Sequence, residues 1–327
     1  MIFTRQLLLV GLSLGALIGI LRGDVLTLER TIPLPTVSGR IDHFGFDAAG
    51  GRLFVAALGN NTVEVIDLNQ GRVIHSIGGL SEPQGISYVA EFNRLFVANG
   101  GDGVLRIFDG TTYGQASALA LGDDADNVRY DATARQILVG YGSGGLATVD
   151  ASTGKPVANV ALSAHPESFQ LEKSGGRVFV NVPRSDQIAV IDRQRGKVVA
   201  TWPIRSAGSN FPMATDESTH RVFVACRSPA CLLVFETATG KEMARLELHG
   251  DCDDLYFDPA RHQIYASCGQ GFIDVFAQTD ADHYALREAV PTVAKARTCF
   301  FDGQQIYLAV PRRGEQPAEI RCYKVNP

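Results

Sequence analysis

Motifs that mark familiar chemistry are missing from this chain of 327 residues. It has no Cys-x-x-Cys pair, which disfavours thioredoxin-like and zinc-ribbon sites, and no Cys-x-x-Cys-His sequence for covalent haem. A Gly-x-Ser-x-Gly elbow and a phosphate-binding glycine loop are also absent. The sequence therefore predicts no cofactor and contains no strong sign of an enzyme.

Tryptophan and basic charge are scarce as well. One tryptophan occurs, and the net charge is −5. The first 23 residues carry two arginines and no acid, so the remainder has 28 basic and 35 acidic residues and a net charge of −7. An acidic excess of this size disfavours binding to nucleic acid or to anionic lipid through bulk charge.

A long apolar run occurs only at the N-terminus. Residues 7–21 form a 15-residue apolar run after Arg5, interrupted only by glycine and serine. This run is short for a membrane span and typical of a signal peptide. Because Leu21-Arg22-Gly23 is a poor cleavage site, an uncleaved membrane anchor is an alternative, and a cytosolic protein with a buried first helix is a weaker one. We expect residues 1–23 to direct the chain to the periplasm or the medium.

A short apolar run recurs seven times, at intervals of 41 to 44 residues. A continuous run of this kind predicts a strand that is buried on both faces. The runs are centred on positions 54, 96, 138, 179, 223, 265 and 307.

Three further strand-like segments accompany each run. In the first repeat they are residues 44–47 before the run, 63–67 after it, and 73–77 beyond a turn that contains glycine. Four strands per 42 residues, repeated seven times, predict an all-β, seven-bladed β-propeller over residues 24–327. The last repeat lacks an outer strand, and residues 29–34 align with the outer strand at 200–204. We therefore expect the N-terminal segment to complete the last blade, because a blade without this strand would expose an additional unpaired edge.

The repeat resembles the WD40-like propellers of the bacterial YVTN-type, or YncE-like, family. Their Tyr-Val-Thr-Asn strand corresponds here to Phe-Val-Ala-Asn at 96–99. Their Ile-Asp element corresponds to residues 66–67 and 191–192, and their Thr-Gly-Lys turn to 153–155 and 239–241. The resemblance covers roughly residues 24–327 and implies the propeller fold. It implies no particular ligand, since members of this family bind different things.

Polar residues at the start of the inner strands are the first candidates for a site. Inner strands converge on the axis of a propeller, so their first residues surround the mouth of its channel. Oxygen ligands together with a histidine suit a divalent cation, which could activate water as in propeller lactonases. Solvated channel lining is the blander alternative, and the sequence alone favours it. The candidate residues are His43, Asp126, Asn127, Glu167 and Asp254.

A basic sector is expected on the same face. The loop of the seventh repeat is longer than its equivalents and carries Arg312 and Arg313, and Arg297 lies in a neighbouring loop with Lys295. Arginine pairs suit the recognition of carboxylate or phosphate. The alternative is a solvated loop that is basic by chance.

All six cysteines lie in the last three repeats, and an even number in an exported protein favours disulfides. Cys226 ends one predicted strand and Cys231 opens the next. Residues facing each other across a hairpin lie about 4.5 to 5.5 Å apart, so we expect a Cys226–Cys231 disulfide. The alternatives are two reduced thiols and a Cys226–Cys268 bond between blades.

Three functions remain open. The leading hypothesis is an exported binding or scaffold module that presents one loop face to a protein, a peptide or a small ligand. The second is a metal-dependent hydrolase of the lactonase type, which bound divalent metal would favour. A nucleic-acid-binding propeller is the weakest, because of the acidic charge. Contact with a membrane is expected only through an uncleaved N-terminus.

Overall fold

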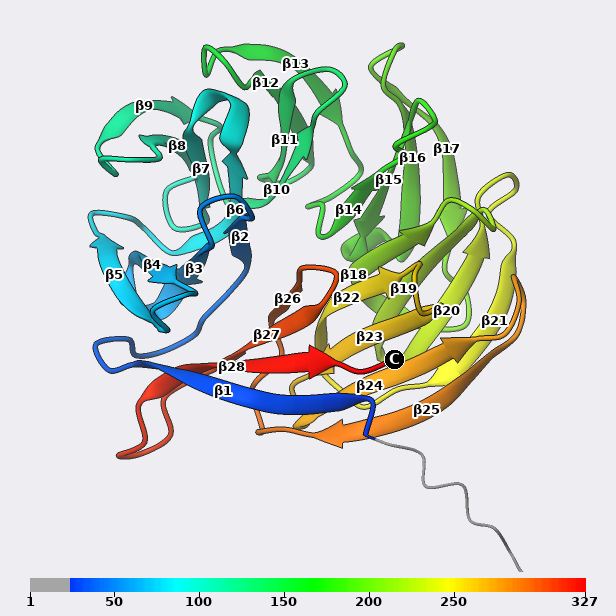
Figure 1. Ribbon diagram of the computed structural model, residues 1–327. Coiled ribbons are helices and arrows are strands. Elements are labelled where there is room, and N and C mark those ends of the chain that lie inside the picture. The colour runs from blue at the N-terminus through cyan, green and yellow to red at the C-terminus, as the bar shows by residue number, and fades with distance from the viewer. Residues whose placement is uncertain (1–23) are drawn as a thin grey trace, which may run out of the picture.

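The computed structural model describes residues 24–327, and the predicted signal peptide or anchor over residues 1–23 lies outside this range. The described chain folds into seven four-stranded antiparallel sheets around a central axis (Figure 1). Its helical segments are three short 3-10 turns, η1 (Leu58–Asn60), η2 (Ala90–Phe92) and η3 (Pro183–Ser185). Within residues 24–327, no helix has the length and apolar character needed to cross a bilayer. The predicted seven-bladed propeller is confirmed.

Each blade contains four strands that are ordered from the axis outward. In blades 1 to 6 the strands follow the chain, and in blade 7 the outermost strand is the first strand of the described chain. The strands are β2 (Phe44–Asp47), β3 (Arg52–Ala57), β4 (Thr62–Asp67) and β5 (Arg72–Ile77) in blade 1; β6 (Pro83–Val89), β7 (Arg94–Asn99), β8 (Val104–Asp109) and β9 (Gln115–Ala120) in blade 2; β10 (Ala125–Asp131), β11 (Gln136–Tyr141), β12 (Gly145–Asp150) and β13 (Pro156–Ala161) in blade 3; β14 (Phe169–Leu171), β15 (Arg177–Val182), β16 (Gln187–Asp192) and β17 (Lys197–Pro203) in blade 4; β18 (Gly208–Asp216), β19 (Arg221–Ser228), β20 (Ala230–Glu236) and β21 (Glu242–Glu247) in blade 5; β22 (Cys252–Asp258), β23 (Gln263–Cys268), β24 (Phe272–Gln278) and β25 (Tyr284–Pro291) in blade 6; and β26 (Cys299–Phe301), β27 (Gln305–Val310), β28 (Ala318–Val325) and β1 (Leu26–Leu34) in blade 7.

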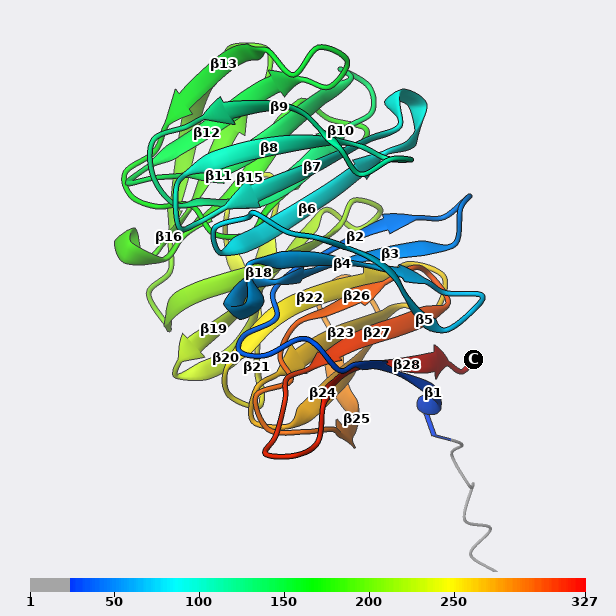
Figure 2. The same cartoon turned by 90° about the vertical axis from the view of Figure 1, so that its left-hand side faces the viewer.

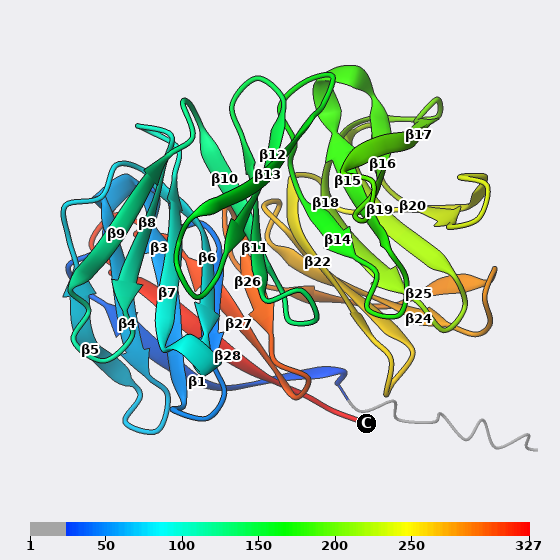
Figure 3. The ribbon, with the colours of Figure 1, turned by 90° about the horizontal axis from the view of Figure 1, so that it is seen from above.

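The hydrophobic core lies between neighbouring blades, which follow one another around the ring (Figures 2 and 3). In β3, Leu53 and Val55 pack toward blade 7, whereas Phe54 and Ala56 pack toward blade 2. All four side chains are fully buried. Because side chains alternate between the two faces of a strand, a strand between two neighbours must be apolar at every position. This packing accounts for the apolar run in each repeat.

The N-terminal strand closes the ring, as the alignment of the outer strands predicts. β1 pairs antiparallel with β28 in blade 7, from Leu26 opposite Val325 to Leu34 opposite Ala318. The two strands lie side by side as the blue and red arrows of Figure 1. Ile32 and Leu34 are fully buried against blades 7 and 1. The first and last parts of the described chain therefore share one sheet.

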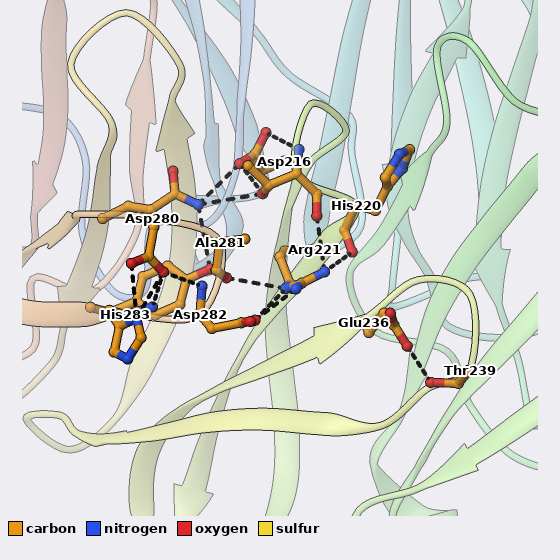
Figure 4. Close-up of polar contacts among 12 residues, drawn as sticks. Asp216, His220, Arg221, Glu236, Thr239, Asp280, Ala281, Asp282 and His283 are labelled. Atoms are coloured by element: carbon orange, nitrogen blue, oxygen red, sulfur yellow. Dashed lines mark hydrogen bonds and ion pairs between the residues drawn. The ribbon is translucent and has the colours of Figure 1, made fainter.

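An aspartate recurs in the turns on the face opposite the axial mouth, where its side chain accepts hydrogen bonds from the turn backbone. In blade 5, Asp216 accepts hydrogen bonds from the backbone N–H and the hydroxyl of Ser218, at 3.0 and 2.6 Å. Arg221 does not pair with this aspartate. Its guanidinium instead reaches blade 6, where it lies 2.6 Å from a carboxylate oxygen of Asp282 and donates to the carbonyl of Ala281 (Figure 4). The repeated aspartates of this face are thus structural, and some of the arginines join neighbouring blades.

Two pairs of cysteines lie directly opposite each other across hairpins. Cys226 faces Cys231 between β19 and β20, and Cys252 faces Cys268 between β22 and β23. All of these thiols are buried and unbonded in the structure. The position of Cys231 is the one that the expected disulfide requires, while the bond itself stays a prediction.

Candidate functional site at the axial mouth

The site lies where the chain enters the inner strands, at one end of the central channel. Several entering segments turn through a residue with left-handed backbone, including Asp124 (φ 35°) and Asp251 (φ 61°). The pairing of β10 with β11 then shifts register after Ala125, and that of β22 with β23 shifts after Cys252. Such bulges insert an extra residue and redirect side chains. The residues at these bulges include Asp126, Asn127 and Asp254.

Asp126, His165 and Glu167 form a compact group of potential metal ligands. Their ligand atoms all lie within 4.8 Å of one another. Protein ligands lie about 2.0 to 2.6 Å from zinc or calcium, so two ligands of one cation are at most about 5 Å apart. Asp126 comes from β10, and the other two come from the segment that enters β14. The spacing therefore fits a single divalent cation.

The ring of His165 is held in an orientation that suits a metal ligand. Its Nδ1 lies 2.6 Å from the carbonyl oxygen of Gly142, so this nitrogen carries a proton and donates it. Its Nε2 faces Asp126, at 3.8 Å from the carboxylate oxygen Oδ2. Histidines that bind metals commonly donate the second ring N–H to a carbonyl or carboxylate, which fixes the ring. The geometry leaves Nε2 directed at the shared position.

Asp126 has one carboxylate oxygen without a partner. The residue is 5% exposed, and its Oδ1 forms no hydrogen bond with any residue in 24–327. The neighbouring Asn127 is 2% exposed, and its carbonyl oxygen is also unpartnered among these residues. Buried polar atoms without partners are costly, and in native proteins they commonly bind a water or an ion. Both oxygens could therefore accept a bond from a water or bind an ion.

A second histidine and acid pair lies beside the first group. Nδ1 of His43, from the segment before β2, lies 3.4 Å from Oδ1 of Asp254 in β22. The other oxygen of Asp254 accepts the backbone N–H of Cys299 at 2.8 Å, which fixes the carboxylate. The charges of Asp42 and Asp126 also act on His43. Blades 1, 3, 4 and 6 therefore contribute to one polar centre.

The clustering of buried carboxylates shifts the pKa values of the histidines and of Glu167. Burial lowers the pKa of His43, but the charges of Asp254 and Asp42 outweigh it and raise that pKa to about 10. His165 behaves similarly: burial opposes the shift, and the interaction with the Asp126 carboxylate together with the hydrogen bond to Gly142 raises the pKa to about 9. For Glu167, burial together with the charge of Asp126 raises the pKa to about 8. Near neutral pH the centre therefore holds protons that a cation could displace.

The structure brings four of the predicted residues together and separates the arginines. His43, Asp126, Glu167 and Asp254 lie in one polar centre at the axial mouth, and Asn127 follows Asp126 in β10. The function of all five stays a prediction. Arg297 and Arg312 line a neighbouring pocket on the same face. Arg313 is outside the lining of that pocket and lies 3.3 Å from Glu319.

Several residues of the site were not among the candidates. His165 shares an entering segment with Glu167, Asp42 and Asp253 directly precede His43 and Asp254, and Arg40 lies three residues before His43. Aligning the entering segments by their distance to the inner strand would have found them. The alignment would not have shown that Arg40 binds Asp42, with 3.0 Å between the guanidinium and the carboxylate.

Below the mouth, a pocket of about 480 Å³ follows the axis between the inner strands. His43 and Asp254 lie at the end next to the mouth, and Tyr130 and Lys173 at the other. Arg129 also lines the pocket, and its guanidinium carbon lies 5.8 Å from the ring centroid of Phe169. The polar centre thus lies between the loop face and this channel.

Comparison with known proteins shows similarity of fold. No protein-family model matches the chain, and no curated protein matches its sequence. A chain of the solved mitotic checkpoint complex is similar over 99% of both chains, with a TM-score of 0.79 and 13% identity. A chain of hydrazine synthase from Kuenenia stuttgartiensis is similar over 93% of this chain and 99% of that one, with a TM-score of 0.72 and 16% identity. At these identities the likeness shows the architecture alone, which is that of a seven-bladed β-propeller.

Proposed function

We propose that this protein is a binding propeller whose ligand site is the axial mouth, with a divalent cation at its centre. Asp126, His165 and Glu167 would hold the cation. The observation that carries this proposal is the buried carboxylate of Asp126, which has one unpartnered oxygen and lies within ligand distance of an oriented imidazole and a second carboxylate. One nitrogen and two oxygen ligands suit Zn²⁺ or Mn²⁺ better than Ca²⁺, which prefers oxygen ligands alone.

The first experiment measures the cation directly. Protein stripped with a chelator is titrated with Zn²⁺ and with Mn²⁺ by calorimetry, and the metal content of untreated protein is measured by mass spectrometry. We expect one site per chain, and His165→Gln and Asp126→Asn should each weaken binding at least about tenfold.

A second His–Asp pair provides the control for this titration. His283 lies 2.8 Å from Asp280 on the opposite face (Figure 4). His283→Gln removes this exposed pair and should leave the affinity unchanged. The proposal would be contradicted if His283→Gln and His165→Gln lost the same amount of metal affinity, or if the wild-type protein bound no stoichiometric metal.

Hydrolysis is the second candidate function, and the His43–Asp254 pair favours it. With a pKa of about 10, His43 carries a proton near neutral pH, so it could accept one from water bound to the metal only after a bound cation has displaced its own proton, or at alkaline pH. The test is hydrolysis of simple lactones and esters by metal-loaded protein, with His43→Gln as the variant. Turnover that requires both the cation and His43 would make the protein a hydrolase. Cation binding without turnover would leave it a binding protein.

The site is proposed to work outside the cytoplasm. The support is the sequence of residues 1–23, with its single early arginine and its short apolar run. Expression in a Gram-negative host, followed by fractionation and N-terminal mass spectrometry, should find the chain in the periplasm without these residues. A protein with intact Met1 in the cytosol would refute export, and the cation site would be unaffected by that result.

A protein or peptide is a further ligand class for the same face. The similar chain in the mitotic checkpoint complex belongs to a protein assembly, which supports this class only at the level of fold. Pulldown from periplasmic extract with wild-type protein and with Asp126→Asn tests whether any partner uses the axial mouth. A partner that both proteins retain equally would bind elsewhere.

A further inference from the structure

A basic pocket lies beside the axial mouth on the loop face. It has a volume of about 460 Å³, which is within the range of small-molecule sites. Four of its lining residues are cations, Arg40, Lys295, Arg297 and Arg312, and Asp251 is the acid among them. These residues come from the segments that enter blades 1, 6 and 7 and from the loop between β27 and β28. We call this site the basic pocket.

Two of the four cations are already neutralised. Arg297 contacts Asp251 at 2.7 Å and Asp253 at 2.8 Å, and Arg40 contacts Asp42 at 3.0 Å. Asp251 is also 3.6 Å from Arg227, so this carboxylate is shared by two guanidinium groups. The acids near the pocket are therefore occupied by these ion pairs.

The other two cations keep their charge available. Arg312 donates to the backbone carbonyls of Pro35 and Val37, which orient its guanidinium without neutralising it. Lys295 is exposed and forms no ion pair with any residue of the described chain. A planar guanidinium held by carbonyls and a mobile ammonium on the same pocket are suited to an anionic group.

The basic pocket is joined to the axial mouth through its ion pairs. Arg40 holds Asp42, which directly precedes His43, and Arg297 holds Asp253, which directly precedes Asp254. One molecule could therefore place an anionic group between Lys295 and Arg312 and a second polar group at the cation.

We propose that the basic pocket binds the carboxylate or phosphate group of a small organic anion, whose other end reaches the axial mouth. The anionic group itself is bound by Arg312 and Lys295 without the cation. The reach to the mouth rests on the proposed function, because it needs the cation at Asp126, His165 and Glu167. The ligand class is thus a small molecule with an anionic group and a second metal-binding oxygen, such as a hydroxy acid or a sugar phosphate.

The test uses inorganic phosphate, acetate and citrate as probes, titrated by calorimetry into chelator-treated protein and into Zn²⁺-loaded protein at low ionic strength. Phosphate or acetate should bind the metal-free protein, and citrate should bind more tightly after Zn²⁺ is added. Preference for phosphate or for acetate identifies the anionic group. The proposal would be overturned if no probe bound at concentrations up to about 10 mM. A dissociation constant above that limit means a binding free energy weaker than about 3 kcal/mol.

Variants assign the binding to the pocket. Lys295→Gln and Arg312→Gln should each weaken the anion about tenfold, since each removes a charge-assisted contact. Arg313→Gln is the matched control in the same loop, because Arg313 is paired with Glu319. Equal loss in Arg313→Gln and Arg312→Gln would overturn the assignment. Lys295 is exposed, so its variant keeps the test valid even if Arg312→Gln fails to fold.

The cation site and the basic pocket can fail separately. In Asp126→Asn, loss of Zn²⁺ with unchanged phosphate binding supports two sites. Phosphate binding to a protein that binds no Zn²⁺ would refute the proposed function and leave the basic pocket standing. Zn²⁺ binding without any affinity for the anions would refute the basic pocket and leave the proposed cation site standing.

Discussion

Individual residues at the axial mouth should make the stability of the protein depend on pH. His43 and Glu167 have folded-state pKa values of about 10 and about 8, against ordinary values of 6.5 and 4.5. Both groups therefore bind their protons more tightly in the folded chain than in the unfolded chain. Their contribution is complete below the ordinary values, and it is lost as the pH rises through 8 for Glu167 and through 10 for His43.

We expect the melting temperature of the metal-free protein to fall between about pH 5 and pH 10 for this reason. Circular dichroism melts across the pH range measure it. Glu167→Gln should flatten the profile mainly below pH 8, and His43→Gln should flatten it mainly above pH 6.5. Variants whose profiles parallel that of the wild type would show that these groups are not the ones that titrate.

The position of these residues could be predicted from the sequence, but their pairing could not. The repeat places His43, Asp126, Glu167 and Asp254 at the same level of the ring, because each precedes or opens an inner strand. The contact between His165 and Gly142 depends on the path of two loops in different blades. Register shifts near Ala125 and Cys252 also change which side chains face the axis, and a periodicity of apolar residues does not contain them.

Among the structural elements, the turns opposite the site join several blades to the next. Three arginines at the start of second strands reach a turn of the following blade: Arg52 binds the carbonyl of Gly110, Arg177 that of Thr237, and Arg221 that of Ala281. These contacts connect residues about 60 positions apart, which is more than one repeat. They act in addition to the apolar core between the blades.

Arg221→Met should lower the free energy of unfolding by about 1 to 3 kcal/mol. It removes the charge-assisted bonds to Ala281 and Asp282 from a guanidinium that is largely buried, while the carbonyl of Ala281 keeps the hydroxyl of Tyr284 as a partner. Arg195→Met is the control, since the Arg195 side chain is 67% exposed and its distance to Asp192 is 3.5 Å. Urea denaturation measures the free energy of unfolding of both variants. Similar decreases would show that the contact between blades 5 and 6 contributes no more to stability than an exposed arginine.

The hairpins of blades 5 and 6 lead to a prediction about their cysteines. Cys226 with Cys231 and Cys252 with Cys268 occupy directly opposite positions, where Cβ atoms come within disulfide reach. Protein from an oxidising compartment should contain both disulfides. Cys299 and Cys322 lie opposite Leu308 and Tyr307 and should remain thiols. Peptide mapping without reduction decides this, and either a free Cys226 or a Cys226–Cys268 bond would refute the assignment.

At the scale of the whole molecule, ring closure should depend on the inward face of β1. Ile32 is fully buried in the cluster between blades 7 and 1, whereas Leu28 on the same strand is 46% exposed. Ile32→Ser should therefore destabilise the ring strongly, and Leu28→Ser should have little effect. Removal of residues 24–34 should expose the edge of β28 and cause aggregation. Thermal melts and size-exclusion chromatography measure these effects, and a truncated chain with wild-type stability would contradict closure by β1.

The ring itself could be predicted because a period near 42 residues is a property of the whole chain. A single strand is hard to assign alone, but seven copies of the same apolar run confirm one another. Closure by the N-terminal segment followed from the missing outer strand of the last repeat. The channel and the basic pocket could not be predicted, since their volumes depend on how side chains from several blades fill the space.

The pairing of β1 with β28 also determines how the ring would respond to mechanical tension. Residue 26 lies opposite residue 325, and Asn326 donates a hydrogen bond to the carbonyl of Asp24. A force that pulls the two ends apart would therefore load the bonds of this ladder one after another, starting at Leu26. Strands loaded in this way separate like a zipper at low force, whereas strands pulled along their length must break many bonds at once. Tension applied at the ends of the propeller would thus open blade 7 first, while the other six blades would still be folded.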